Sequence, residues 1–265
     1  MKKQLFTSLF AAFSLVFASF PSAFAQEDPK IKALDPHLQP NQIVAAYTVE
    51  VGYGLQFPAE LLAKRFGMSN YLSGGVHYYT PKMWFFGLDG GYFFGNNLNE
   101  DPLLPYKTLD GRLLGKDREY SLVVQDERGF MLGAIAGKIF PTSKKYPQTG
   151  IRASLTMGYL QHWIQQRDFN GQTPLLEAPY LMGFDRKTGG FHVTEFIGYQ
   201  FVDNKGYLNL FGGFEFTQGV TKAMRAWDTD LQQPASTATR LDILNGFRLG
   251  ITLALKRPKS DEIFY

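Results

Sequence analysis

The segment LDILNGFRLGITLAL, residues 241–255, alternates between two kinds of side chain. One parity carries Ile, Phe and Leu, with Asn245 as the single exception. The other parity carries Asp242, Arg248 and Thr252 together with two glycines, Leu244 and Ala254. Alternation with a period of two is typical of a β-strand whose two faces meet different surroundings. We therefore predict a strand with one apolar face and one polar, sparsely filled face.

The same pattern recurs in KMWFFGLDGGYFFG, residues 82–95, and in residues 43–56. Asp89 shares its parity with glycines, while Trp84 and Leu88 lie on the opposite, apolar face. Glu50 takes the equivalent place in the earlier segment. Because an unpaired carboxylate is costly to bury in apolar surroundings, the faces that carry Asp89 and Glu50 cannot be apolar.

Five further segments resemble these three, so that the chain has eight candidate strands. The face assignment is clear in residues 206–218, where Glu215 and Thr217 oppose Phe214 and Phe216. It is ambiguous in two of the others, 129–140 and 190–202. The five segments are approximately 70–80, 129–140, 150–163, 190–202 and 206–218.

Strand length and link length together predict the fold class. Most candidates are longer than the five or six residues usual in a globular sheet, and a strand tilted by about 45° crosses a bilayer with about 9–11 residues. Short links near Pro81, at 141–149 and at 203–205 alternate with long links at about 96–128, 164–189 and 219–239, and the first link holds a short helical stretch at 58–66. We predict an all-β fold over residues 43–256: an eight-stranded antiparallel up-and-down transmembrane β-barrel with short periplasmic turns and long outer loops.

The start of the chain predicts export. Lys2 and Lys3 precede an apolar stretch that ends in Ala23-Phe24-Ala25, which predicts a signal peptide over residues 1–25, with a membrane-anchoring helix as the alternative. Residues 26–42 are polar and proline-rich and read as a flexible periplasmic N-terminus, and 257–265 as a periplasmic C-terminal tail. Without Lys2 and Lys3 the basic residues nearly balance the 24 acidic ones, so the charge gives no argument for nucleic acid. The chain has no cysteine, which excludes thiolate metal sites and a lipid-modified N-terminal cysteine.

A barrel in a membrane gives the charged faces a place inside. An eight-stranded barrel is just wide enough for side chains to fill it, and charges inside can pair with one another. We therefore predict a structural ion-pair network that plugs the lumen and leaves no wide channel. Glycines on the inward face would leave room for its long basic side chains. Its predicted members are Glu50, Asp89, Lys138, Arg152, Glu215, Asp242 and Arg248.

Aromatic residues near strand ends suit the girdles at the membrane interfaces. The residues in question are Trp84, Tyr71, Tyr207 and Trp163. The alternative is a soluble β-sandwich or lipocalin-like barrel, which would turn its apolar face inward and its charges outward. The two models disagree about the direction of Glu50, Asp89 and Arg248.

Enzymatic and metal chemistry have little support in the sequence. His162 with Ser154, and His192 with Glu195, are the nearest pairs for a lipid-modifying site, but His162 and Ser154 are about 26 Å apart along one strand. The segments 96–101 (NNLNED) and 227–230 (WDTD) offer oxygen ligands without the spacing of a defined calcium loop. We expect no cofactor, no metal and no catalytic residue.

Several stretches resemble a known family: VEVGYGLQFPAELLAKRFG (49–67), GFDRKTGGF (183–191), EFIGYQF (195–201), GGFEFTQ (212–218) and RLDILNGFRLGITLALKR (240–257). They look like a branch of the small eight-stranded outer-membrane β-barrel proteins, the OmpA/OmpX-type architecture. The resemblance covers about residues 43–256 and implies the fold and a location in the outer membrane. It implies little about activity, because the family includes adhesins, structural tethers, lipid enzymes and subunits of larger machines.

The long links favour a function at the outer surface. Leu103-Leu104, Leu113-Leu114 and Tyr180-Leu181-Met182 lie in otherwise polar segments, and long loops on a rigid scaffold commonly bind something. The 58–66 stretch could lie on the membrane, against a partner, or over the barrel mouth. We expect a non-enzymatic structural or interaction protein, for example an accessory subunit of an outer-membrane complex, in contact with outer-membrane lipids and with a protein partner at its loops. A narrow porin-like channel or a lipid-modifying enzyme is the alternative.

Overall fold

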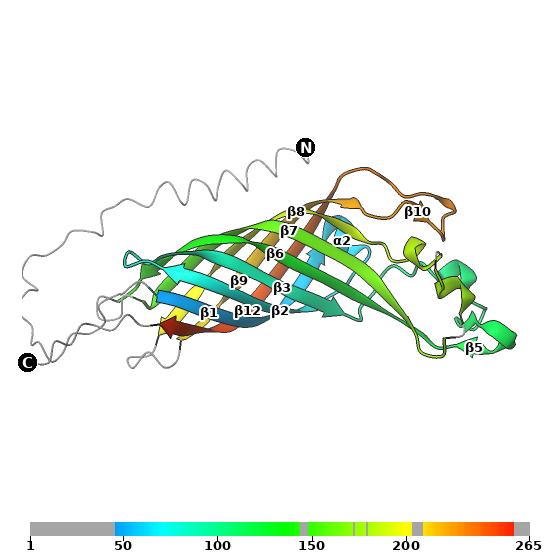
Figure 1. Ribbon diagram of the computed structural model, residues 1–265, viewed down its shortest axis with the longest axis horizontal. Coiled ribbons are helices and arrows are strands. Elements are labelled where there is room, and N and C mark those ends of the chain that lie inside the picture. Colours follow the sequence, from blue (N-terminus) through cyan, green and yellow to red (C-terminus); the bar gives the residue numbers. More distant parts are fainter. Residues whose placement is uncertain (1–45, 144–147, 172, 179, 203–208, 257–265) are drawn as a thin grey trace, which may run out of the picture. The chain divides into compact units, whose positions relative to one another are not determined.

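Eight long antiparallel strands close into a barrel in the order β1-β12-β9-β8-β7-β6-β3-β2 (Figure 1). This computed structural model describes residues 46–143, 148–171, 173–178, 180–202 and 209–256, so that the predicted signal peptide and both predicted periplasmic tails lie outside the described residues. The predicted fold class is confirmed. The strands are β1 (Ala46–Ala59), β2 (Ser69–Tyr79), β3 (Trp84–Gly95), β6 (Val123–Pro141), β7 (Gly150–Asp168), β8 (Thr188–Val202), β9 (Asn209–Ala223) and β12 (Arg240–Lys256).

The barrel closes where β1 pairs with β12, from Ala59 opposite Ile243 to Tyr47 opposite Lys256. The longest pair is β6 with β7, at 19 residues each. We call the end of the barrel with the β2–β3 turn the turn end, and the opposite end the loop end. The sequence predicted both β6 and β7 too short at the loop end. Residues 123–128 and 164–168 carry polar side chains on both faces, although they remain paired.

Shorter elements lie in the links at the loop end. The helix predicted at 58–66 is a single turn, α2 (Glu60–Ala63), and two short hairpins, β4 with β5 and β10 with β11, were not predicted. None of the helices in the described segments is long and apolar enough to cross a membrane. The remaining elements are β4 (Leu113–Leu114), β5 (Tyr120–Ser121), β10 (Trp227–Asp228), β11 (Gln233–Pro234) and the 3-10 turns η2 (Leu104–Tyr106), η3 (Lys116–Arg118), η4 (Pro174–Leu176) and η5 (Tyr180–Gly183).

The two faces of the wall are inverted relative to a soluble barrel. Apolar side chains point outward on all eight strands; Leu88 is 62% exposed and Phe214 58%. Charged side chains point inward, where Arg152 and Asp242 have no exposed surface. A soluble barrel would show the reverse, so the structure excludes the soluble alternative and requires an apolar medium around the wall.

The inward direction predicted for Lys138 is wrong. On β6 the odd-numbered residues, such as Ile135 and Ile139, are buried inside, and Lys138 falls on the outward parity. Its ammonium lies 5.0 Å from the ring centre of Trp84 and 5.3 Å from that of Phe140, at the turn end. A lysine that extends over interfacial aromatic rings keeps its charge near water, as expected at a membrane boundary.

The predicted aromatic girdle is correct in part. Trp84 and Trp163 lie on the outward parity of their strands, whereas Tyr71 points inward and is 4% exposed. Tyr71 packs inside against Phe93, Met131 and Leu160. Tyr207 lies outside the described residues. The lumen therefore contains aromatic layers as well as charges.

Inward glycines leave room for the larger lumen side chains. A Cβ atom on Gly52 would lie 2.7 Å from Ser73 Oγ and 3.3 Å from Arg248 Cδ. A Cβ atom on Gly137 would lie 2.3 Å from the ring of Phe85. The absence of a side chain at these positions allows Arg248 and Phe85 to lie across the interior. Inward glycines were predicted to leave this room for the basic side chains.

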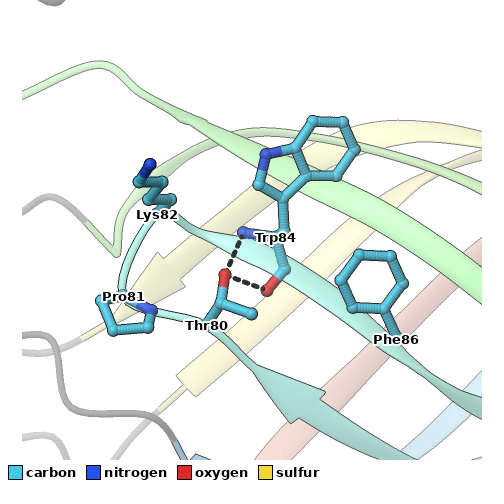
Figure 2. A pocket seen from close by; sticks show the side chains of 5 residues that line it. All are labelled: Thr80, Pro81, Lys82, Trp84 and Phe86. Carbon is cyan, nitrogen blue, oxygen red and sulfur yellow. Dashed lines mark hydrogen bonds between the residues drawn. The ribbon is translucent and has the colours of Figure 1, made fainter.

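The β2–β3 turn is tied by the side chain of Thr80 (Figure 2). The Thr80 hydroxyl accepts a hydrogen bond from the Trp84 N–H at 3.2 Å and lies 3.1 Å from the Trp84 carbonyl, to which it donates. Thr80, Pro81, Lys82, Trp84 and Phe86 line an open surface pocket beside this turn. Trp84 and Phe86 belong to the apolar outer wall, so the pocket continues the membrane-facing surface.

A charge on the outer wall tests the inverted barrel. Leu88→Arg places a guanidinium near the middle of β3 on the apolar face, and we expect it to lower the free energy of unfolding by about 2–4 kcal/mol in lipid bilayers. The measurement is denaturant unfolding in vesicles, with Leu88→Phe as the control that keeps the face apolar. Equal stability of the two variants would contradict the membrane-spanning assignment.

Candidate functional site at the loop end

The lumen is filled near the turn end by a buried pair between Arg152 and Glu50. Two guanidinium nitrogens of Arg152 donate to the two carboxylate oxygens of Glu50, each at 2.8 Å. Tyr79 and Thr252 donate to the same carboxylate at 3.0 and 3.1 Å. The guanidinium also lies between the rings of Phe85 and Phe211, 4.5 and 4.6 Å from their centres. Both carboxylate oxygens of Glu50 and both terminal nitrogens of Arg152 are thus bonded from within the barrel, whereas Arg152 Nε has no hydrogen-bond partner among the described residues.

A second group joins Arg248 with two acids. Arg248 Nη1 lies 3.1 Å from Asp89 Oδ2, and Arg248 Nε lies 2.9 Å from Glu215 Oε1. All three side chains are less than one-tenth exposed. The structure thus brings together Glu50 with Arg152, and Asp89 with Arg248 and Glu215.

Asp242 lies apart from these groups, nearer the loop end. Its Oδ2 lies 2.8 Å from Nε2 of His162 and accepts a hydrogen bond from Thr221 at 2.6 Å. Arg240 Nε donates to its other oxygen at 2.7 Å. Asp242 therefore belongs to a cluster that includes His162, a residue that sequence analysis considered only with Ser154.

The first link folds over this cluster and caps the lumen. Leu62 of α2 and Phe66 have no exposed surface, and they pack against Ile164 and Leu244 on the inner wall. The ring of Phe66 meets the ring of His162 edge to face at 5.4 Å. Of the three locations considered for residues 58–66, the structure shows the barrel mouth.

Arg186 joins the loop layer above the cap. It donates to Glu100 Oε1 at 2.6 Å and makes two hydrogen bonds to Asp230, at 2.9 and 2.5 Å, and Arg65 donates to the second oxygen of Glu100 at 2.7 Å. Arg65, Glu100, Arg186 and Asp230 come from the first, third, fifth and seventh links of the barrel. One ion-pair network, with Asp228 and Arg225 at its edge, thus connects all four loops at this end.

The backbone of Arg186 carries strain that fits this position. Its φ is 50°, in the left-handed region that few residues other than glycine adopt. Arg186 is 4% exposed, and the carboxylates of Glu100, Asp228 and Asp230 neutralise its charge. Burial alone would lower the pKa of Arg186, but Asp230 and Glu100 raise it above its ordinary value. The ion pairs are therefore the interaction that can hold this backbone conformation.

A small hydrophobic core and cross-loop hydrogen bonds add to the network. Leu103 and Leu113 of the third link are buried against Phe184 of the fifth. Tyr106 donates to the carbonyl of Thr229 at 3.0 Å, which joins the third and seventh links. The loops thus form one packed layer.

This layer presents apolar side chains to the solvent, which we call the loop face. Large apolar residues rarely gather on the exposed surface of a protein without a binding role. Their exposed fractions range from 58% to more than 100% of the reference value. The members of the loop face are Leu104, Leu109, Leu122, Phe169, Tyr180 and Met182.

The residues considered for catalysis and metal binding do not come together in the described structure. His162 and His192 are 0% and 1% exposed inside the barrel, and His192 points inward while Glu195 points outward on the same strand. Of the carboxylates considered as cation ligands, Glu100, Asp228 and Asp230 are bonded to arginines of the loop layer, and Asp101 is bonded to Lys107. Within the described segments no group of three or more potential ligands is placed to hold a metal ion.

Sequence reasoning missed the residues that organise the loops. Arg65, Arg186 and Asp230 lie in links without a repeating pattern, so no periodicity indicated their pairing. It also missed Glu127, an inward residue of β6 with no exposed surface and no hydrogen-bond partner for either oxygen. The only available signal for Glu127 was the alternation of its strand, and polar residues on both faces obscured it.

Strand order, inverted wall and filled lumen together define a transmembrane β-barrel of the outer-membrane type, with its long links packed at one end. The chain is similar in fold to the crystal structure of Neisserial surface protein A (NspA), with 13% sequence identity over 78% of this chain and 96% of that one and a TM-score of 0.42. It is also similar in fold to the crystal structure of Ail, the attachment invasion locus protein of Yersinia pestis, in complex with the heparin analogue sucrose octasulfate. The sequence identity is 10% over 80% of this chain and 99% of that one, and the TM-score is 0.39. No protein-family model and no curated protein match the sequence. The fold assignment therefore rests on the strand order and register of this structure.

Removal of the central arginine tests the loop network. Arg186→Met leaves Glu100 and Asp230 without their shared cation, and we expect the loop layer to be destabilised by about 1–3 kcal/mol while the barrel stays folded. Limited proteolysis of the folded protein should then cleave the loops roughly tenfold to a hundredfold faster. Arg112→Met, at an exposed arginine of the same layer, is the matched control. Equal cleavage rates in the two variants would show that Arg186 does not hold the loops.

The pH dependence of the loop layer gives a second test. Burial would raise the pKa of Glu100, but the charges of Arg65 and Arg186 hold it below its ordinary value of 4.5. A lowered pKa stabilises the folded layer fully above pH 4.5, and this stabilisation is lost as the pH falls through the lower, folded value. We expect loop proteolysis by an acid protease to accelerate below pH 4.5. Glu100→Gln should lose part of this acceleration, and an unchanged profile would contradict the assignment.

Proposed function

We propose that this protein is an outer-membrane interaction protein that binds a protein partner through its loop face. The observation that supports this most directly is a layer of four loops, fixed by Arg186 and its carboxylates, that exposes Leu104, Leu109, Tyr180 and Met182. A pre-organised apolar surface binds with little loss of conformational entropy. An outer-membrane location and signal-dependent export belong to the same proposal, because the outer-membrane bilayer supplies the apolar medium that the wall requires.

An open channel has less support. Arg152 and Glu50 lie across the interior between Phe85 and Phe211, and Leu62 and Phe66 cap the loop end. A water-filled path would have to displace this cap and separate a buried ion pair. We therefore propose that the lumen is a structural core.

A lipid-modifying enzyme has less support for a related reason. The two histidines that sequence analysis considered are enclosed, since His162 lies beneath Phe66 and bonds to Asp242. His192 bonds to Thr194 inside the wall. A head group at the rim would reach neither imidazole, so we propose a function without a catalytic residue.

Substitution of the loop face tests the interaction. The triple variant Leu104→Ser, Leu109→Ser, Leu122→Ser removes apolar contacts without touching the Arg186 network. We expect it to lose at least 90% of the protein that co-purifies stoichiometrically with the tagged wild type in gentle detergent, because buried apolar contacts dominate interface affinity. Lys82→Ser, at the exposed turn at the other end, is the control and should keep the partner.

Three experiments separate the interaction proposal from the alternatives. Recovery of the wild-type protein with lipid alone would contradict the interaction proposal. Stable single-channel steps in planar bilayers would instead support a pore, and a change in outer-membrane lipid structure on deletion of the gene would support an enzyme.

A further inference from the structure

Three polar side chains lie together on the outer wall, at a level where the outward residues of the other strands are apolar. Glu195 of β8, Gln218 of β9 and Asn245 of β12 fall on the outward parity of their strands; Gln218 and Asn245 are half-buried, and Glu195 is 8% exposed between its outward neighbours. Phe216 of β9 lies between two of them, because it is paired with Glu195 of β8 on one side and with Asn245 of β12 on the other. Gln218 is the next outward residue after Phe216 on β9. We call these three residues the wall patch.

The wall patch is confined to one sector of the barrel. Strands β8, β9 and β12 are adjacent in the sheet, and each carries one member near its middle. The outward residues at the same level of the other strands are apolar, as shown by Val51, Leu88, Leu132 and Met157, all of which are exposed. β3 lies four strands away from β9 in the order of the closed barrel, on its opposite side. Random placement of polar residues would not favour one side.

Within the described part of the chain, no hydrogen bond or ion pair satisfies the wall patch. The lumen groups cannot reach it through the wall, and the in-register neighbours of Glu195 are Leu155 and Phe216. Lipid chains offer neither donors nor acceptors, so a polar side chain at this depth is costly unless a partner protein supplies them. Polar residues on a membrane-facing surface therefore indicate a contact within the membrane.

We propose that the wall patch is the interface of a homodimer, in which two copies of this barrel meet side by side through β8, β9 and β12. The patch is complementary to itself: Glu195 supplies an acceptor, and the carboxamides of Gln218 and Asn245 supply donors. A two-fold axis along the membrane normal places the left edge of one patch opposite the right edge of the other. Glu195 of each copy then faces the carboxamide side of the second copy, with Phe216 near the axis.

The dimensions suit this arrangement. Adjacent strands are about 4.8 Å apart, so the Glu195 and Asn245 backbones lie about 10 Å apart on the two sides of Phe216. Glutamate and glutamine side chains can span a strand spacing, so the carboxylate can reach a carboxamide of the second copy on either side of the axis. The contact also encloses Phe214 and Phe216, which are 58% and 40% exposed in one copy. The proposal is independent of the loop face, which lies at the end of the barrel.

Cysteine cross-linking in native membranes tests the dimer. The chain has no cysteine, so a single introduced thiol has no background. Phe216→Cys places a thiol at the proposed axis, and Leu88→Cys places one at an equally apolar position on the opposite side of the barrel. We expect oxidation to convert at least five times more of the Phe216→Cys protein than of the Leu88→Cys protein into a disulfide-linked dimer of twice the chain mass.

Variants of Glu195 separate the interface from folding. In the Phe216→Cys background, Glu195→Leu removes the acceptor and should lower the dimer yield at least fivefold, whereas Glu195→Gln keeps hydrogen-bonding capacity and should retain at least half of it. Glu195→Leu should leave the barrel at least as resistant to unfolding as before, because it removes an unpaired polar group from the apolar wall. Equal cross-linking at positions 216 and 88, a Glu195→Leu variant that still dimerises, or cross-linking to a different protein would overturn the proposal.

Discussion

The pair between Arg152 and Glu50 shows the constraint on which the rest of the structure depends. A closed barrel satisfies every backbone donor of its strands, but it leaves a narrow interior that the side chains themselves must fill. Removing two charges from water costs several kcal/mol per ion, and mutual attraction compensates only when the geometry is good and the remaining hydrogen bonds are made. The geometry is good here, with two 2.8 Å bonds, further donors from Tyr79 and Thr252, and aromatic rings on the guanidinium, and most of the remaining hydrogen bonds are made; Arg152 Nε has no partner among the described residues. Once one member is buried, its partner has to be present.

The same requirement extends from the lumen to the loops. Ion pairs and aromatic side chains share the interior, from the Arg152 pair to the His162–Asp242 cluster, and Phe66 covers the last of these. The four loops begin directly above this cap, so a packed lumen gives them a fixed base. Arg186 then connects the loops by the same chemistry of shared carboxylates, of which Glu100 is partly exposed. The rigidity of the loop face thus originates in the packing of the barrel.

Sequence alternation determines which way a residue points but not which residue it meets. The inward direction of Glu50, Asp89, Arg248 and Asp242 follows from the apolar opposite parity of their strands, and the eight-stranded fold follows from the same signal. The pairing of Asp242 with His162 could not be predicted, because it depends on the stagger of strands that are 80 residues apart in sequence. The Arg186 network had even less signal, since loops have no period.

The sequence leaves the inward and outward faces of 129–140 and 190–202 ambiguous, for different physical reasons. In 129–140 both parities carry small residues, such as Gly133 and Gly137 inside and Ala134 and Ala136 outside, so that the alternation is weak and Lys138 was assigned to the wrong face. In 190–202 the outward parity is apolar except at Glu195, and the inward parity carries Phe196 and Val202 among polar residues. Asn245 is the corresponding exception in the most regular strand of the chain, and β9 alone separates the two residues. Weak alternation in β6 reflects small side chains that make room for the lumen. An isolated polar residue on an otherwise apolar face has no such packing role, and its recurrence on adjacent strands indicates that this sector of the wall meets something other than lipid.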